Sequence, residues 1–148
     1  MSKSEPLYFV PLGGSGEIGM NLNLYGYGPE EDRTWIIVDC GVTFGDLTTP
    51  GVDIITPDPR FIEERRHQLA AIVLTHAHED HMGAVAHLWR RLRCPIYATP
   101  FTAWLMRDRL AERTGVRVTD SAIYTALKGL GFTFKKKRST PRSRTGPM

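Results

Sequence analysis

Four side chains that can bind a metal ion lie within one heptapeptide of the 148-residue sequence. Imidazole and carboxylate groups suit zinc and also manganese. Two such ions, about 3.5–4 Å apart, can share a hydroxide and stabilise both the attacking and the leaving oxygen of a displacement. The heptapeptide is Thr75-His76-Ala77-His78-Glu79-Asp80-His81, and its candidate ligands are His76, His78, Asp80 and His81.

The candidate ligands fall into two pairs. In a loop that leaves a strand, His76 and His78 can point to the same side and hold one cation. Asp80 and His81, at the turn into a helix, can hold a second cation beside it, and Asp80 is also the candidate catalytic residue. The alternative is a polar surface cluster. Three of the five histidines of the chain share this heptapeptide, which favours the metal site.

The flanking sequence predicts how the heptapeptide is held. The apolar run at residues 70–74 predicts a buried strand before it, and helical spacing predicts a helix at residues 83–92 after it. The other two histidines, His67 and His87, lie on predicted helix surfaces, so we expect structural or solvent-exposed roles for them. Two free thiols, Cys40 and Cys94, form no CxxC pair and are expected to be idle in a reducing compartment.

A carboxylate elsewhere in the chain is the candidate support for the site. Asp39 ends an apolar run at residues 35–38 that predicts another buried strand. A carboxylate in this position can hydrogen-bond a metal-bound histidine and orient its ring. The alternative for Asp39 is an ordinary loop cap. Glu79, between the ligands, is expected to face solvent or to cap the helix.

The stretch GSGEIG, residues 14–19, reads as G-x-G-x-x-G, the pattern of a dinucleotide-binding loop. That pattern requires a helix directly after its last glycine. Residues 20–27 instead alternate apolar and polar side chains, which predicts a strand. We therefore expect a tight loop between two strands, whose backbone can approach another group closely.

The remaining sequence predicts one α/β domain followed by a basic tail. Strands are expected at residues 7–10 and 95–98, a long loop at 40–59, and helices at 61–68 and 99–113, the last capped by Thr99. Residues 1–120 carry 12 basic and 16 acidic side chains, whereas seven further basic residues and no acid follow. We expect a partial domain at residues 1–114 and a divergent, disordered basic tail at 115–148. No stretch predicts a membrane span or a secretory signal, so we expect a cytoplasmic protein.

The heptapeptide THAHEDH after a buried strand resembles the signature of the metallo-β-lactamase superfamily. The stretches PLGGSGEIGMN, VDCGVTFGD, PGVDIITPD and CPIYATPFT also resemble the N-terminal part of the ribonuclease J family, in the β-CASP branch that acts on RNA. The resemblance covers about residues 7–113. It implies the N-terminal half of an αββα sandwich, two divalent metal ions, an RNA substrate degraded by 5′-to-3′ exonuclease and endonuclease action, and a full-length protein that is a homo-oligomer.

The resemblance also implies residue roles. His76 and His78 match the ligands of one metal ion, and Asp80 and His81 match those of the other. Asp39 matches the acidic position that supports the site. In addition, Gly14 and Ser15 match an active-site loop near the metal ions.

Several features of the family have no counterpart in this sequence. No histidine follows His87, and the inserted β-CASP domain is absent, so we expect a fragment of about a quarter of such an enzyme that binds metal weakly and has little activity alone. Two alternatives remain open. One is another hydrolase of the same fold, such as a thioesterase of the glyoxalase II kind. The other is a non-catalytic fragment that binds RNA through its basic tail.

Overall fold

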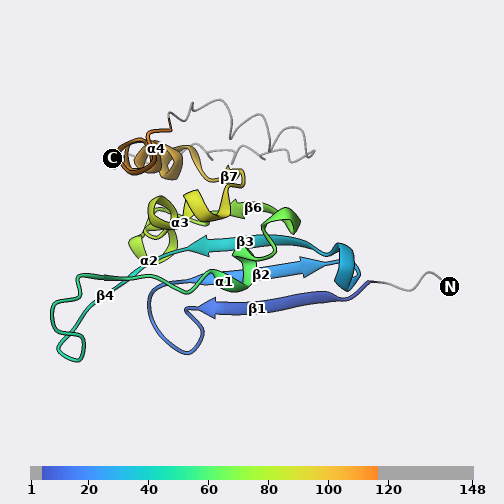
Figure 1. Cartoon of the computed structure of the whole chain (residues 1–148). Coiled ribbons are helices and arrows are strands. Elements are labelled where there is room, and N and C mark those ends of the chain that lie inside the picture. Colours follow the sequence, from blue (N-terminus) through green and yellow to red (C-terminus); the bar gives the residue numbers. More distant parts are fainter. Residues whose placement is uncertain (1–4, 117–148) are drawn as a thin grey trace, which may run out of the picture.

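A five-stranded sheet organises the described part of the chain, residues 5–116, in the computed structural model (Figure 1). Its strands lie in the order β1-β2-β3-β6-β7. The first three strands are antiparallel neighbours, whereas β6 runs parallel to both β3 and β7. The strands are β1 Leu7–Gly13, β2 Leu22–Tyr27, β3 Thr34–Cys40, β6 Leu69–Val73 and β7 Ile96–Tyr97.

Helices connect the parallel strands and pack against the sheet. Helices α1 and α3 contact each other, and α4 packs on α3. In Figure 1, α4 lies beyond α3 and β7, at the end of the sheet opposite β1. The helical segments are α1 Arg60–Glu63, α2 Glu79–Met82, α3 Val85–Leu92 and α4 Pro100–Thr114, with short 3-10 turns η1 Glu30–Asp32 and η2 Arg66–Gln68.

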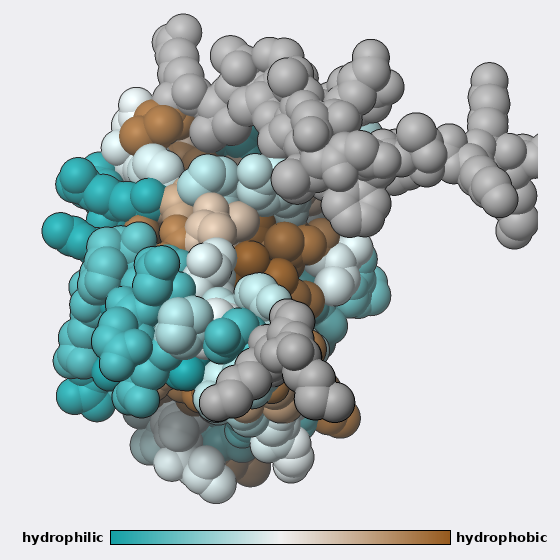
Figure 2. Space-filling view, turned by 90° about the vertical axis from the view of Figure 1, so that its right-hand side faces the viewer, coloured by the Kyte–Doolittle hydropathy of each residue, from teal (hydrophilic) through white to brown (hydrophobic). Residues whose placement is uncertain are grey.

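The alternating pattern of the strands separates the two faces of the sheet. On one face Leu24 and Ile37 pair across β2 and β3 and are fully buried in a core shared with the helices. On the other face Phe9 pairs with Tyr25, and Tyr25 with Ile36; Phe9 is 53% exposed and the other two are half-buried. Figure 2, which views the molecule from the right of Figure 1, shows hydrophobic side chains at the surface beside a hydrophilic region. One sheet with helices on one face agrees with the expected half of an αββα sandwich.

The ends of α4 follow standard capping chemistry. The hydroxyl of Thr99 accepts a hydrogen bond from the backbone N–H of Thr102 at 3.3 Å, and Pro100 occupies the first helical position. At the other end Gly115 adopts φ +70°, the left-handed conformation that terminates helices. These contacts confirm the predicted helix start and extend its end by one residue.

Two predicted segments differ from the structure. The expected loop at residues 40–59 contains a short hairpin, because β4 Thr43–Phe44 pairs with β5 Ile54–Ile55. Its β-branched and aromatic residues are separated by the glycines and prolines that dominated the sequence pattern. The expected helix at 61–68 is divided into α1 and η2, since Arg65 between them leaves the helical conformation.

The predicted tail lies largely outside the described residues. The expected disordered tail at 115–148 overlaps the described residues only at Gly115 and Val116, so its state is untested. None of the helices among residues 5–116 has the length and apolar character needed to cross a bilayer.

The two thiols lie in the core and should be unreactive in the folded protein. Burial raises the pKa of Cys40 to about 12 and that of Cys94 to about 11, from a usual value of 9.0. At pH 8 we therefore expect iodoacetamide to alkylate the native chain much more slowly than the chain in guanidinium. Above about pH 9 the unfolded chain loses thiol protons that the folded chain retains, so the urea midpoint should fall as the pH rises. Rapid alkylation of both thiols in native buffer would contradict this burial.

Candidate metal centre

The heptapeptide that carries the candidate ligands lies where β6 ends and α2 begins. Its histidine rings gather there: the ring centre of His76 lies 4.6 Å from that of His78 and 4.0 Å from that of His81. His76 and His81 are half-buried, and His78 is exposed at the N-cap of α2. The structure thus brings three of the four candidate ligands together. Asp80, the fourth, contacts this cluster because its carboxylate lies beside the ring of His81.

Asp39 connects this cluster to the neighbouring strand. It lies near the end of β3, which pairs in parallel with β6, so the carboxyl ends of the two strands lie side by side. Its side chain is buried, with 5% of the residue exposed, and its backbone adopts φ +65°. One carboxylate oxygen accepts the backbone N–H of Thr75 at 2.8 Å, and the other lies 2.8 Å from Nδ1 of His81.

These contacts fix which ring nitrogens carry protons. A carboxylate can only accept, so Nδ1 of His81 donates to Asp39. The hydroxyl of Thr75 lies 3.0 Å from both oxygens of Asp39 and therefore donates its single proton there. Nδ1 of His76 lies 2.9 Å from that hydroxyl and consequently donates to it. In the neutral form of each ring, Nε2 of His76 and of His81 is left with a free lone pair.

The second predicted ligand pair has the spacing that a shared cation requires. Nε2 of His81 lies 3.2 Å from Oδ2 of Asp80. Both atoms are electron-rich, so a proton or a cation must lie between them. Ligands bound tetrahedrally at about 2.0–2.2 Å from zinc are separated by about 3.4 Å, which is close to the observed distance. The donor set of Asp80 and His81 therefore fits a divalent ion.

The first predicted ligand pair, His76 and His78, shows no comparable spacing for a shared cation. The rings of His76 and His78 meet edge to face, with an interplanar angle of 72°. Among residues 5–116, no three His, Cys, Asp or Glu side chains are arranged to share one metal ion. The sequence prediction assigns two protein ligands to each ion and does not require such a group of three, so the assignment of these ligands stays a prediction.

The glycine-rich loop reaches the site through one asparagine. Gly14 adopts φ +81°, and a Cβ placed on it would overlap the side chain of Asn21. Asn21 donates two hydrogen bonds to the backbone carbonyl of Asp80, from its backbone N–H and its side-chain amide, each 3.0 Å long. Ser15 is exposed, and no hydrogen bond to the candidate ligands is found for it. The predicted loop between two strands is confirmed, because β2 and not a helix follows it.

Close backbone contact fixes the position of Asp80 from a second side. Gly41 follows β3 and donates to the carbonyl of Asn21 at 2.8 Å, and a Cβ on Gly41 would overlap the carbonyl oxygen of Asp80. Sequence reasoning assigned no role to Asn21, Gly41 or Thr75. The only available signal was the glycine that directly follows Asp39 and Cys40 at a strand end. Many glycines occur at strand ends, so this position did not indicate a role.

The side chain of Glu79 is partly exposed in the first turn of α2, which agrees with its expected position facing solvent or at the helix start. Glu79 is the first residue of α2, and its Oε1 lies 2.6 Å from Nη1 of Arg109 on α4. This ion pair joins α2 to α4 through two residues that are thirty positions apart in the sequence. Both side chains remain partly exposed, so its contribution to stability is small.

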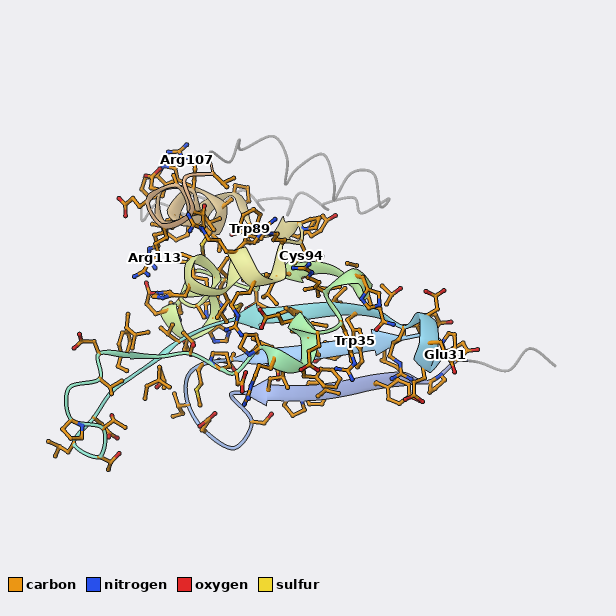
Figure 3. All side chains as sticks on the ribbon, viewed as in Figure 1. Glu31, Trp35, Trp89, Cys94, Arg107 and Arg113 are labelled. Carbon is orange, nitrogen blue, oxygen red and sulfur yellow. The ribbon has the colours of Figure 1, made fainter. Side chains whose placement is uncertain are left out.

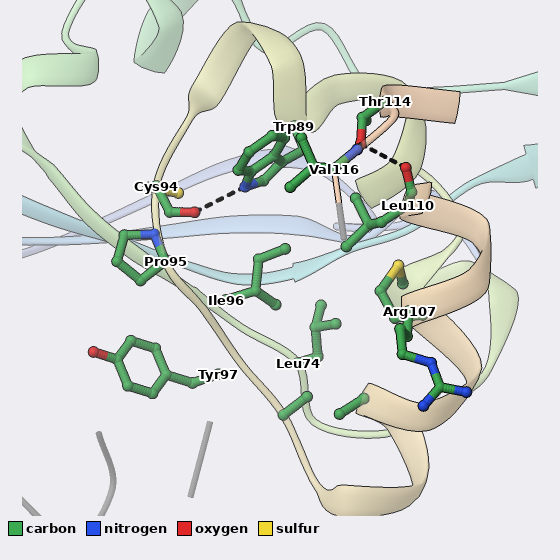
Figure 4. A pocket seen from close by; sticks show the side chains of 13 residues that line it. Leu74, Trp89, Cys94, Pro95, Ile96, Tyr97, Arg107, Leu110, Thr114 and Val116 are labelled. Atoms are coloured by element: carbon green, nitrogen blue, oxygen red, sulfur yellow. Dashed lines mark hydrogen bonds between the residues drawn. The ribbon is translucent and has the colours of Figure 1, made fainter. Parts of the chain in front are cut away.

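A separate apolar cavity of about 220 Å³ lies between β7, α3 and α4 (Figure 4). Trp89 crosses one side of it and donates to the carbonyl of Cys94 at 2.9 Å. Leu74, Met106 and Leu110 contribute to its apolar lining, which includes neither a histidine nor a carboxylate. It therefore lacks the chemistry of the heptapeptide, and the candidate metal centre is the histidine cluster.

Gly41 offers a test of the close backbone contact. Replacing it by alanine, Gly41→Ala, forces a methyl group into the Asp80 peptide, and we expect a loss of at least about 2 kcal/mol in the free energy of unfolding. Gly51→Ala is the control, because its side chain would enter open space and only the left-handed backbone, worth about 1 kcal/mol, is strained. Urea unfolding of the three chains measures the difference. Equal losses in the two variants would contradict the contact.

Comparison with known proteins agrees with this geometry. The family model described as the metallo-beta-lactamase superfamily matches residues 29–136. Ribonuclease J of Sinorhizobium meliloti is 56% identical over 111 residues, which are 75% of this chain and 20% of the relative. Ribonuclease J of Mycolicibacterium smegmatis is 44% identical over 107 residues, 72% of this chain and 18% of the relative. Ribonuclease J 1 of Streptococcus pyogenes is 36% identical over 129 residues, 87% of this chain and 22% of the relative.

The chain spans about a fifth of the length of these relatives. The family match extends past residue 114, where the sequence predicted a domain boundary, so that boundary stays a prediction. A sheet with helices on one face, a histidine cluster at the end of a parallel strand and the family match all agree. The chain belongs to the metallo-β-lactamase superfamily and is similar to the N-terminal portion of ribonuclease J.

Proposed function

We propose that this chain supplies the metal-binding loop of a metal-dependent ribonuclease of the ribonuclease J type. The observation that carries the proposal is the hydrogen-bond chain from Asp39, which leaves Nε2 of His76 and of His81 free to bind metal. The names of the similar proteins supply the substrate class, RNA. They do not favour the thioesterase or the non-catalytic alternative.

We propose different roles for the residues at the site. His76 and His78 would hold one divalent ion, and Asp80 and His81 the other, with Asp80 beside the reacting groups. Asp39 would keep both rings oriented by accepting hydrogen bonds from Thr75 and His81. When bound, such ions lower the pKa of water to about 7 and stabilise negative charge on a phosphodiester.

Finer features of the proposal rest on the resemblance. We propose two ions, zinc or manganese, and RNA processing and decay by 5′-to-3′ exonuclease and endonuclease action. A cytoplasmic location and a homo-oligomeric full-length protein belong to the same proposal. Gly14 and Ser15 would border the substrate, since Gly14 packs on the asparagine that holds the Asp80 carbonyl.

A chimera tests the activity without relying on this chain alone. Residues 1–114 of this chain replace the matching segment of the Sinorhizobium meliloti ribonuclease J, to which it is 56% identical. We expect the purified chimera to hydrolyse 5′-monophosphorylated RNA with added manganese or zinc, and the double variant His76→Ala with Asp80→Ala to be inactive. A glutathione thioester serves as the competing substrate.

The chimera has clear contrary outcomes. A folded chimera that leaves RNA intact, or that hydrolyses the thioester instead, would overturn the proposal. RNA hydrolysis that survives loss of both His76 and Asp80 would remove the role assigned to the heptapeptide. Circular dichroism and thermal unfolding of each protein confirm that it is folded.

Metal affinity gives a test of Asp39 that does not depend on activity. In Asp39→Asn the charged acceptor for Nδ1 of His81 is lost, so the ring is no longer held in the tautomer that exposes Nε2. We expect zinc affinity to fall by about 10–100-fold, measured by competition with a fluorescent chelator. Asp32→Asn removes the same charge from an exposed turn and should leave zinc affinity unchanged. Equal zinc affinities in Asp39→Asn and the parent chain would contradict the orienting role.

A further inference from the structure

A groove of about 430 Å³ runs beside the metal-binding loop. The β4–β5 hairpin forms one wall through Phe44 and Ile54, and the C-terminal half of α4 forms the other through Arg109 and Arg113. Glu79, which lies between the candidate ligands His78 and Asp80 in the sequence, also lines the groove, whereas none of the four candidate ligands does. The groove, hereafter the α4 groove, therefore adjoins the metal-binding loop through Glu79.

The charges on the α4 wall are not equivalent. Arg109 is paired with Glu79 at 2.6 Å, so its charge is already compensated. No carboxylate of the described residues lies within ion-pair distance of Arg113, although Glu112 also lines the groove. Figure 3 shows Arg113 projecting from α4 toward the side of the molecule that carries α2 and the hairpin. Arg113 is thus an exposed cation at the rim of a concave surface, with no ion-pair partner among residues 5–116.

The positive charge of Arg113 affects the pKa of a neighbouring histidine. His87, on α3, lines the same groove and is half-buried. Burial lowers the pKa of His87, and the positive charge of Arg113 lowers it further. His87 is therefore held toward its neutral form, and Arg113 remains the cation available to an anion in the groove.

The opposite wall has a different chemistry. Phe44 is 60% exposed and Ile54 is 42% exposed, so an apolar surface faces the cation across the groove. A nucleotide unit combines a charged phosphate with a less polar sugar and base. The two walls match these two parts, since single-stranded nucleic acids bind to grooves that combine cations with apolar or aromatic surfaces.

We propose that the α4 groove holds the backbone of a single-stranded RNA beside the metal centre, with Arg113 contacting one phosphate. The inference rests on the proposed ribonuclease function and extends it by naming where the substrate strand lies. The path of the RNA strand follows from the positions of the two walls. The strand passes between the hairpin and α4 and reaches the metal-binding loop at Glu79.

Binding measurements test the groove separately from hydrolysis. The complete 148-residue chain is titrated into a fluorescein-labelled single-stranded RNA in EDTA, so that no metal-dependent cleavage occurs, and anisotropy gives the affinity at several salt concentrations. For Arg113→Gln we expect weaker binding and a slope of log affinity against log salt that is smaller by about 0.7, the loss of one phosphate contact on a single strand. Arg113→Lys keeps the charge and should retain the slope of the parent chain.

Arg66→Gln is the matched control, because Arg66 is an exposed arginine on η2 for which residues 5–116 supply no ion pair. The basic residues after position 120 are present in every variant, so they contribute equally to each measurement. An unchanged slope in Arg113→Gln, an equal loss in Arg66→Gln, or no RNA binding by the parent chain would each overturn the inference. If the chimera hydrolyses RNA while Arg113→Gln binds normally, the groove is wrong and the proposed ribonuclease function stands.

Discussion

The carboxylate of Asp39 is the constraint on which the candidate metal centre depends. It is buried and can only accept hydrogen bonds, so each polar group in contact with it must donate a hydrogen bond. Thr75 and His81 do so directly, and His76 does so through the Thr75 hydroxyl. One charge therefore determines the tautomers of two rings, and it leaves their opposite nitrogens unprotonated. A buried carboxylate with fewer donors would be costly, which explains why the heptapeptide must lie directly beside this strand end.

The parallel pairing of β3 and β6 makes that adjacency possible. Both strands end at the same edge of the sheet, so Asp39 and Thr75 meet although they are 36 positions apart. The backbone then completes the arrangement, because Gly41 and Asn21 hold the Asp80 peptide from two sides. Three segments of the chain thus converge on one peptide group. Main-chain contacts therefore help to position the candidate ligands, in addition to the contacts of their side chains.

Sequence reasoning identified the parts of this site that depend on local pattern. Apolar runs predicted β3 and β6, and the dense spacing of histidines identified the heptapeptide. Asp39 was recognised because a carboxylate at the end of a buried strand can hydrogen-bond a metal-bound histidine. Asn21, Thr75 and Gly41 were missed because their roles depend on which segments meet in space, and a glycine or asparagine near a turn has many explanations. The β4–β5 hairpin was missed because two residue pairs are too short to produce an alternating pattern.

The ion pair between Glu79 and Arg109 links the two regions that carry the proposed functions. Glu79 belongs to the helix that follows the ligands, and Arg109 belongs to the wall of the α4 groove. Because Arg109 is paired with Glu79, this carboxylate would repel a phosphate in the groove less strongly. Arg113, one turn further along α4, has no ion-pair partner among residues 5–116 and would attract that phosphate. In the proposed function, the position of α4 would therefore affect both the charge beside the candidate metal centre and the binding of the strand.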